Sequence, residues 1–389
     1  MNVLLCPMSD AGYLYPAVAV GRELRDRGHD AVVLGRASVA SVPAHAGLPF
    51  LAAEELGEAN GFSVRSWSRQ GLAQYRAVLR AVPVTRADVI VTSALSHGAL
   101  LAAEVLDLPV VVLGLAAYLW EYPAGAENEP KSPAARAWRT RGEAGRYRSL
   151  REQAGLQPRR DRRPETPLLG TTFLLRGHPS LEYPGALLPG RVRYVGPCAW
   201  EPPAAPAELA EIDAHLGRIG KPVVYVHLGR WFQGPSLWPL LNAAFAEGPF
   251  QAVVELGRSE AEEPAPGTDI LVVHKPWMAP LIDRAELVLS GGTSAPVLNA
   301  LLRGRPLALA PIGSEQPLLA EACVRAGVAL CLPQSAGAHS LAALRAACDD
   351  GLRGRAAELG RALAAADSTR RAADAVAGVA HALPVSPGQ

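Results

Sequence analysis

The residues best suited to chemistry surround a glycine turn, Gly291-Gly292-Thr293-Ser294. The apolar run before it is typical of a buried strand, and the residues after it are typical of a helix. Such a turn leaves the first backbone N–H groups of the helix without partners and directs the positive end of the helix dipole at one point. This arrangement suits a diphosphate. Glycines also start helices that merely pack closely on a sheet, so the turn alone does not establish a site.

A carboxylate and an amide, Glu315 and Gln316, come after the next apolar run. Their polar atoms can hydrogen-bond hydroxyl groups. If a diphosphate lies at the glycine turn, this pair is placed to hold hydroxyl groups on whatever the diphosphate carries.

Composition narrows the possible classes of protein. A chain of 389 residues is long enough for two domains, and its net charge of +1 gives no field that would gather nucleic acid or an anionic membrane. The five cysteines are widely spaced and form no metal-ligand pattern, which is typical of a reducing compartment. The first residues lack the features of a secretory signal, and charged residues interrupt the most apolar stretch. We therefore expect a cytoplasmic protein without a membrane span.

Short apolar segments alternate with helical patterns in both halves of the chain. In the first half we predict strands at 2–6, 31–34, 89–91 and 110–113, with a loop over 7–15 and a helix from Pro16. In the second half we predict strands at 223–227, 251–256, 270–273, 287–290, 306–310 and 328–331, followed by helices at 341–364 and 368–382. Apolar strands alternating with helices predict parallel sheets covered on both faces.

Prolines concentrated between residues 176 and 206 indicate a junction between domains. We predict domains at 1–190 and 207–365, a linker at 191–206, and a C-terminal helix at 366–389 that returns to the first domain. The fold class is α/β, with two doubly wound, Rossmann-like domains facing a deep cleft. Loops after the strands should line that cleft, because open parallel sheets bind ligands beyond the carboxyl ends of their strands. The segment 118–161 is either an acceptor pocket or lid, or a solvated helical excursion.

These motifs resemble those of the GT-B-fold nucleotide-sugar glycosyltransferases, and most of all the bacterial enzymes that decorate antibiotics and other secondary metabolites. The likeness covers nearly the whole chain and is sharpest from His274-Lys275-Pro276-Trp277 to Glu315-Gln316. It implies a dTDP- or UDP-linked sugar donor, no metal or other cofactor, and a small aromatic or polyketide-like acceptor. It also implies transfer with inversion, and a homodimer stays open.

The resemblance implies particular roles in donor binding. His274 would pack on the nucleotide base, Asn299 would contact the ribose or a phosphate, and Glu315 with Gln316 would hold the sugar hydroxyls. The implied donor site comprises Gly229, Arg230, His274, Trp277, Ser290, Gly291, Gly292, Thr293, Ser294, Asn299, Glu315 and Gln316. His274 could equally be a packing residue.

The chain departs from the family at the glycine turn. The family carries His-His-Gly-Gly there, whereas this chain has Ser290 followed by Gly291 and Gly292, so the imidazole that would meet the diphosphate is missing. Backbone N–H groups and the hydroxyls of the turn can still donate to an anion. Arg230 could supply the lost positive charge, or it is an ordinary surface residue.

The chain also departs from the family at the catalytic base. Inverting relatives place a histidine after the glycine of the first loop, but here Tyr13 follows Gly12. Tyrosine titrates near pH ~10 and is a poor base at neutrality. Asp10 could be the base, His97 could approach from a later strand end, or the acceptor needs little help because it is an amine, an acidic phenol or an electron-rich ring carbon.

Other chemistries lack their motifs: the sequence has no GxGxxG after the first strand, no Walker loop, no metal cluster and no GxSxG. Two rivals share the predicted fold. One is a GT-B-shaped binding or accessory protein without catalysis, which the missing histidines would fit. The other is a sugar-nucleotide epimerase, which would turn over without an acceptor.

Overall fold

The computed structural model describes residues 1–56, 64–122, 132–159, 166–229, 237–246, 248–257, 263–332 and 338–381. The chain forms two compact units, which we describe separately. Unit 1 comprises Met1–Trp200 and Asp367–Gln389, and unit 2 comprises Glu201–Ala366. The first boundary thus lies within residues 191–206, and the last helix belongs to unit 1.

Unit 1 is built on a seven-stranded sheet in the order β3-β2-β1-β4-β5-β6-β7. Every neighbouring pair is parallel. The strands are β1 Asn2–Cys6, β2 Asp30–Gly35, β3 Phe50–Ala52, β4 Val89–Ser93, β5 Val110–Leu113, β6 Thr172–Leu175 and β7 Val192–Tyr194. The central strands are buried throughout, which explains their continuous apolar sequence.

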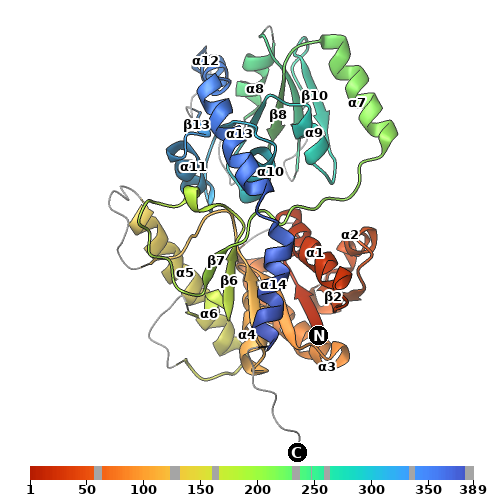
Figure 1. The fold of residues 1–389 in the computed structure, drawn as a ribbon, viewed down its shortest axis with the longest axis vertical. Coiled ribbons are helices and arrows are strands. Elements are labelled where there is room, and N and C mark those ends of the chain that lie inside the picture. The colour runs from red at the N-terminus through yellow and green to blue at the C-terminus, as the bar shows by residue number, and fades with distance from the viewer. Residues whose placement is uncertain are drawn as a thin grey trace, which may run out of the picture. The chain divides into compact units, whose positions relative to one another are not determined.

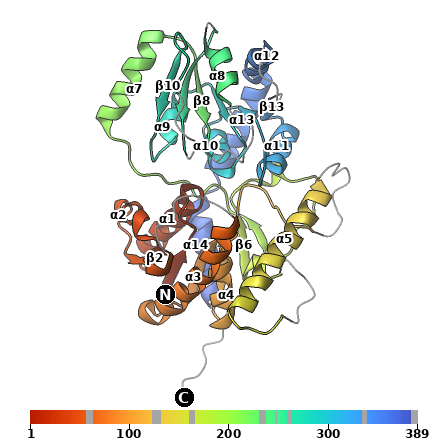
Figure 2. The same ribbon diagram turned by 180° about the vertical axis from the view of Figure 1, so that it is seen from behind.

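Helices cover both faces of this sheet. They are α1 Ala11–Asp26, α2 Ser41–His45, α3 Val64–Thr85, α4 His97–Val105, α5 Ser132–Gln153, α6 Thr166–Leu169 and α14 Ser368–His381, with short 3-10 helices at Ala37–Val39, Glu54–Leu56 and Pro179–Leu181. On one face α14 lies beside α1 (Figure 1). On the other face α3, α4 and α5 pack against one another (Figure 2).

The predicted loop over 7–15 is wrong from Ala11 onward, because α1 begins there and Pro16 lies inside it. Proline has no N–H, so the carbonyl of Gly12, four residues earlier, loses its helical donor. The guanidinium of Arg176 replaces that donor: its Nη2 donates to the Gly12 oxygen at 3.0 Å, and its Nε donates to the Gly114 oxygen at 2.7 Å. Arg176, buried just beyond β6, therefore lets the helix continue through the proline.

Helix α14 completes the core of unit 1. Its Ala372, Ala373 and Val376 are buried in the same cluster as Leu14 and Val18 of α1. At its start the hydroxyl of Ser368 accepts a hydrogen bond from the backbone N–H of Cys198 at 3.0 Å. The end of the chain is therefore a structural part of the unit that contains its beginning.

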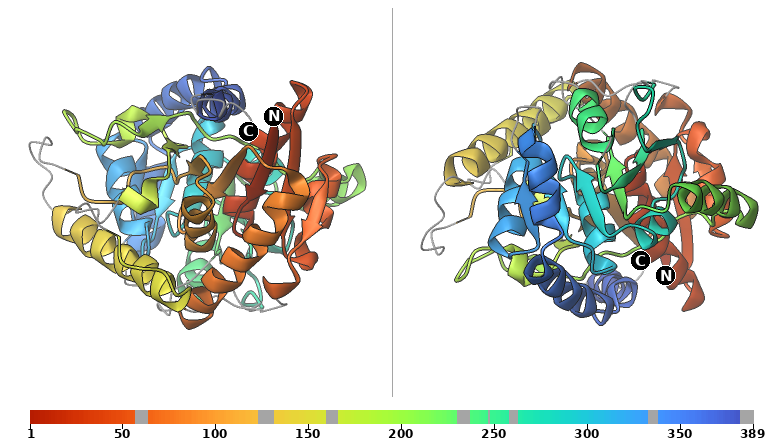
Figure 3. Two further views of the ribbon diagram at one scale, coloured as in Figure 1. Left: turned by 90° about the horizontal axis from the view of Figure 1, so that it is seen from below. Right: turned by 90° about the horizontal axis from the view of Figure 1, so that it is seen from above.

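Unit 2 is built on a six-stranded sheet in the order β10-β9-β8-β11-β12-β13, again with parallel pairs only. The strands are β8 Val223–His227, β9 Gln251–Glu255, β10 Ile270–Val273, β11 Leu287–Ser290, β12 Leu307–Leu309 and β13 Ala329–Cys331. Figure 3 shows this sheet from above, with helices on both of its sides.

The helices of unit 2 are α7 Pro206–Ile219, α8 Trp238–Phe245, α9 Ala279–Asp283, α10 Ser294–Leu302, α11 Gln316–Arg325, α12 Ala338–Ala347 and α13 Asp350–Ala364. The single helix predicted at 341–364 is therefore two. Asp349 separates them, because its carboxylate accepts hydrogen bonds from the N–H groups of Gly351 and Leu352 and caps α13.

Two parallel sheets flanked by helices confirm the predicted α/β class. The sequence does not predict β3, β6 and β7, of which β3 and β7 are three-residue strands at the sheet edges. Strands this short show no periodicity of their own. In the described parts of the chain, no helix combines the length and the apolar character needed to cross a bilayer.

Candidate functional site

The glycine turn of unit 2 joins the end of β11 to the start of α10. Gly292 has a φ of +87°, a conformation that favours glycine, and its N–H donates to the hydroxyl of Ser290 at 3.2 Å. Ser290 is fully buried, so its hydroxyl holds the turn from inside. The strand, the glycine turn and the helix start predicted from the sequence are all present.

The glycines of the turn allow the start of α11 to approach closely. A Cβ atom on Gly291 would lie 2.9 Å from Nε2 of Gln316, and one on Gly292 would lie 3.4 Å from the Gln316 backbone oxygen. Any side chain at Gly291 would therefore displace Gln316.

The first turn of α10 offers few donors. Thr293 is its N-cap residue and makes no side-chain capping hydrogen bond. The N–H groups of Ser294 and Ala295 lie at the helix start, where no intrahelical acceptor is available, and Pro296 has no N–H. An anion at this point would lie at the positive end of the α10 dipole, beside the Thr293 hydroxyl.

Asn299 lies one turn further along α10, and its amide is used within the helix. Its Nδ2 donates to the Ala295 oxygen at 3.2 Å, and its Oδ1 accepts from Nη1 of Arg303 at 3.1 Å. Each of these atoms keeps one further hydrogen-bonding position, since an amide has two N–H donors and two acceptor lone pairs.

Gln316 fastens the loop after β12 onto the glycine turn. Its Oε1 accepts hydrogen bonds from the N–H groups of Ile312 at 2.8 Å and Gly313 at 3.2 Å, and the residue is only 1% exposed. Glu315 is 8% exposed and bonded to the hydroxyl of Ser314. Gln316 is thus adjacent to the turn; its amide oxygen is engaged by the loop, and its Nε2 is the amide atom nearest to Gly291.

Sequence reasoning missed a second group of polar residues in unit 2. His227 ends β8 and Glu255 ends β9, and Nδ1 of His227 lies 2.8 Å from Oε2 of Glu255. His274, just after β10, places its Nδ1 3.8 Å from Oε1 of the same carboxylate. The available signal was that both missed residues are polar ends of apolar strands, where ligands bind in open parallel sheets.

The carboxylate of Glu255 is ionised despite its burial. Desolvation would raise its pKa, but His227, the N–H of Gly257 and then His274 oppose it, and the pKa is lowered overall. A buried carboxylate between two imidazoles is therefore a fixed negative charge at the ends of these strands.

Three further donor-site candidates are Gly229, Arg230 and Trp277. Gly229 follows β8 with a φ of +58°, and Arg230 lies outside the described residues. Trp277 is 3% exposed and packs inside unit 2, whereas the His274 side chain is 73% exposed. Of these two aromatic groups, His274 is the one whose face is open to a base.

The candidate bases Asp10 and Tyr13 lie where β1 leads into α1. Asp10 is the N-cap residue of α1, and its backbone oxygen accepts from the N–H groups of Tyr13 and Leu14 at 2.9 and 2.8 Å. Both candidate side chains are half-buried.

His97, the third candidate base, is the first residue of α4 and is held against α5. Its Nε2 lies 3.5 Å from Oε2 of Glu143, and the ring meets Tyr147 edge to face at 6.1 Å. Burial, reinforced by Arg146, lowers the pKa of His97 to about 3. Burial, opposed by Arg146 and Arg139, raises the pKa of Glu143 to about 7. His97 is thus a buried, neutral and weakly basic imidazole.

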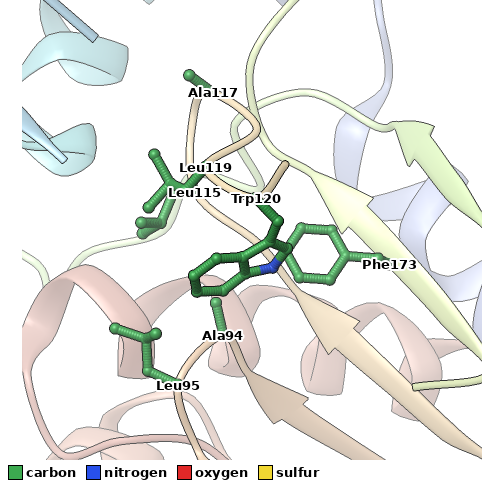
Figure 4. A pocket seen from close by; sticks show the side chains of 7 residues that line it. All are labelled: Ala94, Leu95, Leu115, Ala117, Leu119, Trp120 and Phe173. Carbon is green, nitrogen blue, oxygen red and sulfur yellow. The ribbon is translucent and has the colours of Figure 1, made fainter. Parts of the chain in front are cut away.

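Unit 1 also contains an apolar hollow at the carboxyl ends of its central strands. It is lined by Ala94, Leu95, Leu115, Ala117, Leu119, Trp120 and Phe173 (Figure 4). Ala94 and Leu95 follow β4, and the residues from Leu115 to Trp120 follow β5. The hollow is small, about 10 Å³, which is room for a single water molecule.

Within the residues that the structure describes, no three His, Cys, Asp or Glu side chains form a group that could hold a metal ion. All five cysteines are free.

No protein-family model and no curated protein matches the sequence. Solved structures match the fold. The glycotransferase of kitacinnamycin has a TM-score of 0.74 and 20% identity, over 97% of this chain and 98% of that chain. CalG4, the calicheamicin glycosyltransferase, has a TM-score of 0.70 and 22% identity over 99% of both chains. Glycosyltransferase VinC in complex with dTDP has a TM-score of 0.67 and 17% identity, over 98% of this chain and 100% of that chain.

These likenesses extend over nearly the whole chain and include both parallel sheets. At this level of identity they define the architecture. The chain therefore has the GT-B fold that these glycosyltransferases share.

Proposed function

We propose that the protein transfers a sugar from a nucleoside diphosphate to a small acceptor. The observation that carries this proposal is the glycine turn at the end of β11, where Gly292 and the start of α10 form an anion site of the kind that helix N-termini provide. The GT-B fold supports it, and the VinC structure was solved with dTDP. Both dTDP- and UDP-linked sugars fit the proposal.

In the proposed reaction the acceptor attacks the anomeric carbon from the face opposite the diphosphate. The bond from that carbon to the diphosphate oxygen breaks, the configuration inverts, and the electron pair leaves with the nucleoside diphosphate. Main-chain donors at Ser294 and Ala295 and the Thr293 hydroxyl would stabilise the leaving anion without a metal. Glu315 would hold the sugar, and Gln316 would join it once the loop after β12 reorders.

Asp10 is the base that we favour, and it would take the proton from the acceptor. Its carboxylate lies at the start of α1, whereas His97 is buried against α5 with a pKa of about 3. An acceptor that loses its proton easily would make the base dispensable.

The apolar hollow of unit 1 favours an aromatic or polyketide-like acceptor. Its lining contains the indole of Trp120 and the ring of Phe173, and both residues are buried. Because both rings are already buried, an aglycone would remove apolar area from water here only after the lining opens around it.

The proposal is tested by incubating the full chain with dTDP- and UDP-sugars and a panel of aromatic and polyketide acceptors. We expect release of nucleoside diphosphate that depends on the acceptor. Binding of the nucleotide without turnover across the panel would favour the catalytically silent binding protein, and turnover without acceptor would favour the epimerase. If no nucleoside diphosphate binds, the proposed donor site is wrong.

A further inference from the structure

Three adjacent strands of unit 2 end in polar side chains at the same level. The sheet order places β8 between β9 and β11, and the register pairs His227 with both Glu255 and Ser290. Side chains of paired residues in parallel strands point to the same face of the sheet. Glu255, His227 and Ser290 therefore form one row, which ends at the glycine turn.

One ring nitrogen of His227 faces a buried carboxylate. Its Nδ1 lies 2.8 Å from Oε2 of Glu255, whose side chain is 5% exposed, and Oε1 of that carboxylate accepts from the N–H of Gly257 at 3.0 Å. At this distance the carboxylate and the ring form an ion pair when the ring is protonated. The His227 side chain itself is 15% exposed, so one edge of it is accessible.

The residue next to the other ring nitrogen, Nε2, is a glycine. A Cβ atom on Gly229 would lie 3.0 Å from Nε2 of His227, and a Cβ atom on Gly257 would lie 2.8 Å from the Gly229 Cα. Both glycines have positive φ, at +58° and +59°. The turns after β8 and β9 therefore pack closely together. Because residue 229 is a glycine, it places no side chain over Nε2 of His227.

We propose that His227, oriented by Glu255, is the cationic contact for the donor diphosphate and replaces the imidazole that is missing from the glycine turn. His227 lies one strand away from Ser290, the position at which that imidazole is absent. Ser290 is fully buried and bonded to the N–H of Gly292, so its hydroxyl supports the turn. The inference rests on the proposed function and assigns the positive charge of its anion site.

The first test compares a nucleoside diphosphate with its parent nucleoside in the full chain carrying His227→Gln. A charge-assisted hydrogen bond is lost, so we expect the affinity for dTDP or UDP to fall about tenfold or more. The affinity for thymidine or uridine should stay unchanged. His215→Gln, which removes an imidazole from α7, is the matched control and should leave both affinities as in the wild type.

The second test uses Glu255→Gln, because the direction of its effect on diphosphate affinity distinguishes two cases. If Glu255 sustains the charge on His227, its neutral replacement weakens diphosphate binding by several-fold. If His227 is neutral in the site, Glu255 is merely a negative charge near an anion, and its removal strengthens binding. Stronger or unchanged binding in this variant would overturn the inference.

The two proposals fail in different ways. A wild-type protein that binds neither dTDP nor UDP would overturn the proposed function and the inference with it. A wild type that binds, together with a His227→Gln variant that keeps the wild-type ratio of diphosphate to nucleoside affinity, would overturn the inference alone. Nucleoside binding also reports whether each variant is folded.

Discussion

Gln316 is predicted to bind the ligand, but in the structure its side chain stabilises the protein itself. Its amide oxygen takes two backbone N–H groups of the loop after β12, and its nitrogen lies over Gly291. The loop and the glycine turn are therefore set by one side chain. Since an unpaired buried amide would be costly, the amide has little freedom to turn toward a sugar without reordering that loop.

Gly292→Leu should weaken nucleoside diphosphate binding about tenfold or more, because a side chain at a φ of +87° strains the turn that aims the donors. Isothermal titration calorimetry measures this change. Gly354→Leu in α13 is the matched control, since a Cβ atom there has nothing within 4 Å. Equal affinities in the two variants would remove the turn from the donor site.

Asp10→Asn should lower the single-turnover rate by about a hundredfold or more if Asp10 is the general base. His97→Ala should lower the rate less than tenfold, because the buried ring is a weak base. Tyr13→Phe provides the third comparison. Equal rates in all three variants would indicate an acceptor that deprotonates easily.

At the scale of elements, two contacts explain how helices are held against the first sheet. Arg176 satisfies the carbonyl that Pro16 leaves free in α1, and α4 meets α5 through His97 and Glu143. Neither contact is readable from local sequence, because each joins residues far apart in the chain. The sequence pattern predicts a helix start at Pro16, whereas this proline lies in the interior of α1.

Arg176→Met should destabilise unit 1 by about 2–4 kcal/mol, since one buried and one partly buried carbonyl lose their donor. In a Pro16→Ala background the new N–H can bond the Gly12 oxygen, so the cost of losing Arg176 should shrink by about 1 kcal/mol. Denaturant unfolding of the four proteins measures this coupling. Strictly additive effects would show that the proline and the arginine act independently.

Glu143→Gln should raise the free energy of unfolding relative to the wild type, and the difference should grow as pH rises. Folding raises the pKa of Glu143 from its ordinary value to about 7, so the wild type loses stability as pH rises from about 4.5 through 7 while the neutral amide does not. The difference in unfolding free energy should be near zero at pH 4 and about 1–3 kcal/mol at pH 8. Glu152→Gln, at an exposed position of α5, should show no such trend.

At the scale of the whole molecule, the sequence predicts the architecture better than the site. The strands with long apolar runs, such as β5 and β8, were predicted at their observed bounds because burial on both faces leaves a continuous signal. The pairing of His227 with Glu255 depends on strand order and register, which no local pattern contains. The glycine turn was predictable because its chemistry is contiguous in the chain.

Removing residues 367–389 should loosen unit 1 and leave unit 2 intact, because the buried residues of α14 lie in the core of unit 1. Hydrogen exchange should show lost protection in α1 and the neighbouring strands. A chain that ends after His381 is the control and should exchange like the full protein. If the chain that lacks residues 367–389 keeps the protection of the full protein in unit 1, α14 does not contribute to that core.

The position of α14 has a consequence for biosynthesis. Glu201–Ala366 is one uninterrupted stretch, so this portion can close its core without a segment from elsewhere in the chain. The amino-terminal portion emerges first but waits for the final helix, and until then the apolar surface of Leu14 and Val18 has no cover from it. Unit 1 is therefore complete only once α14 has been made, and the apolar surface of α1 is what a chaperone would meet before then.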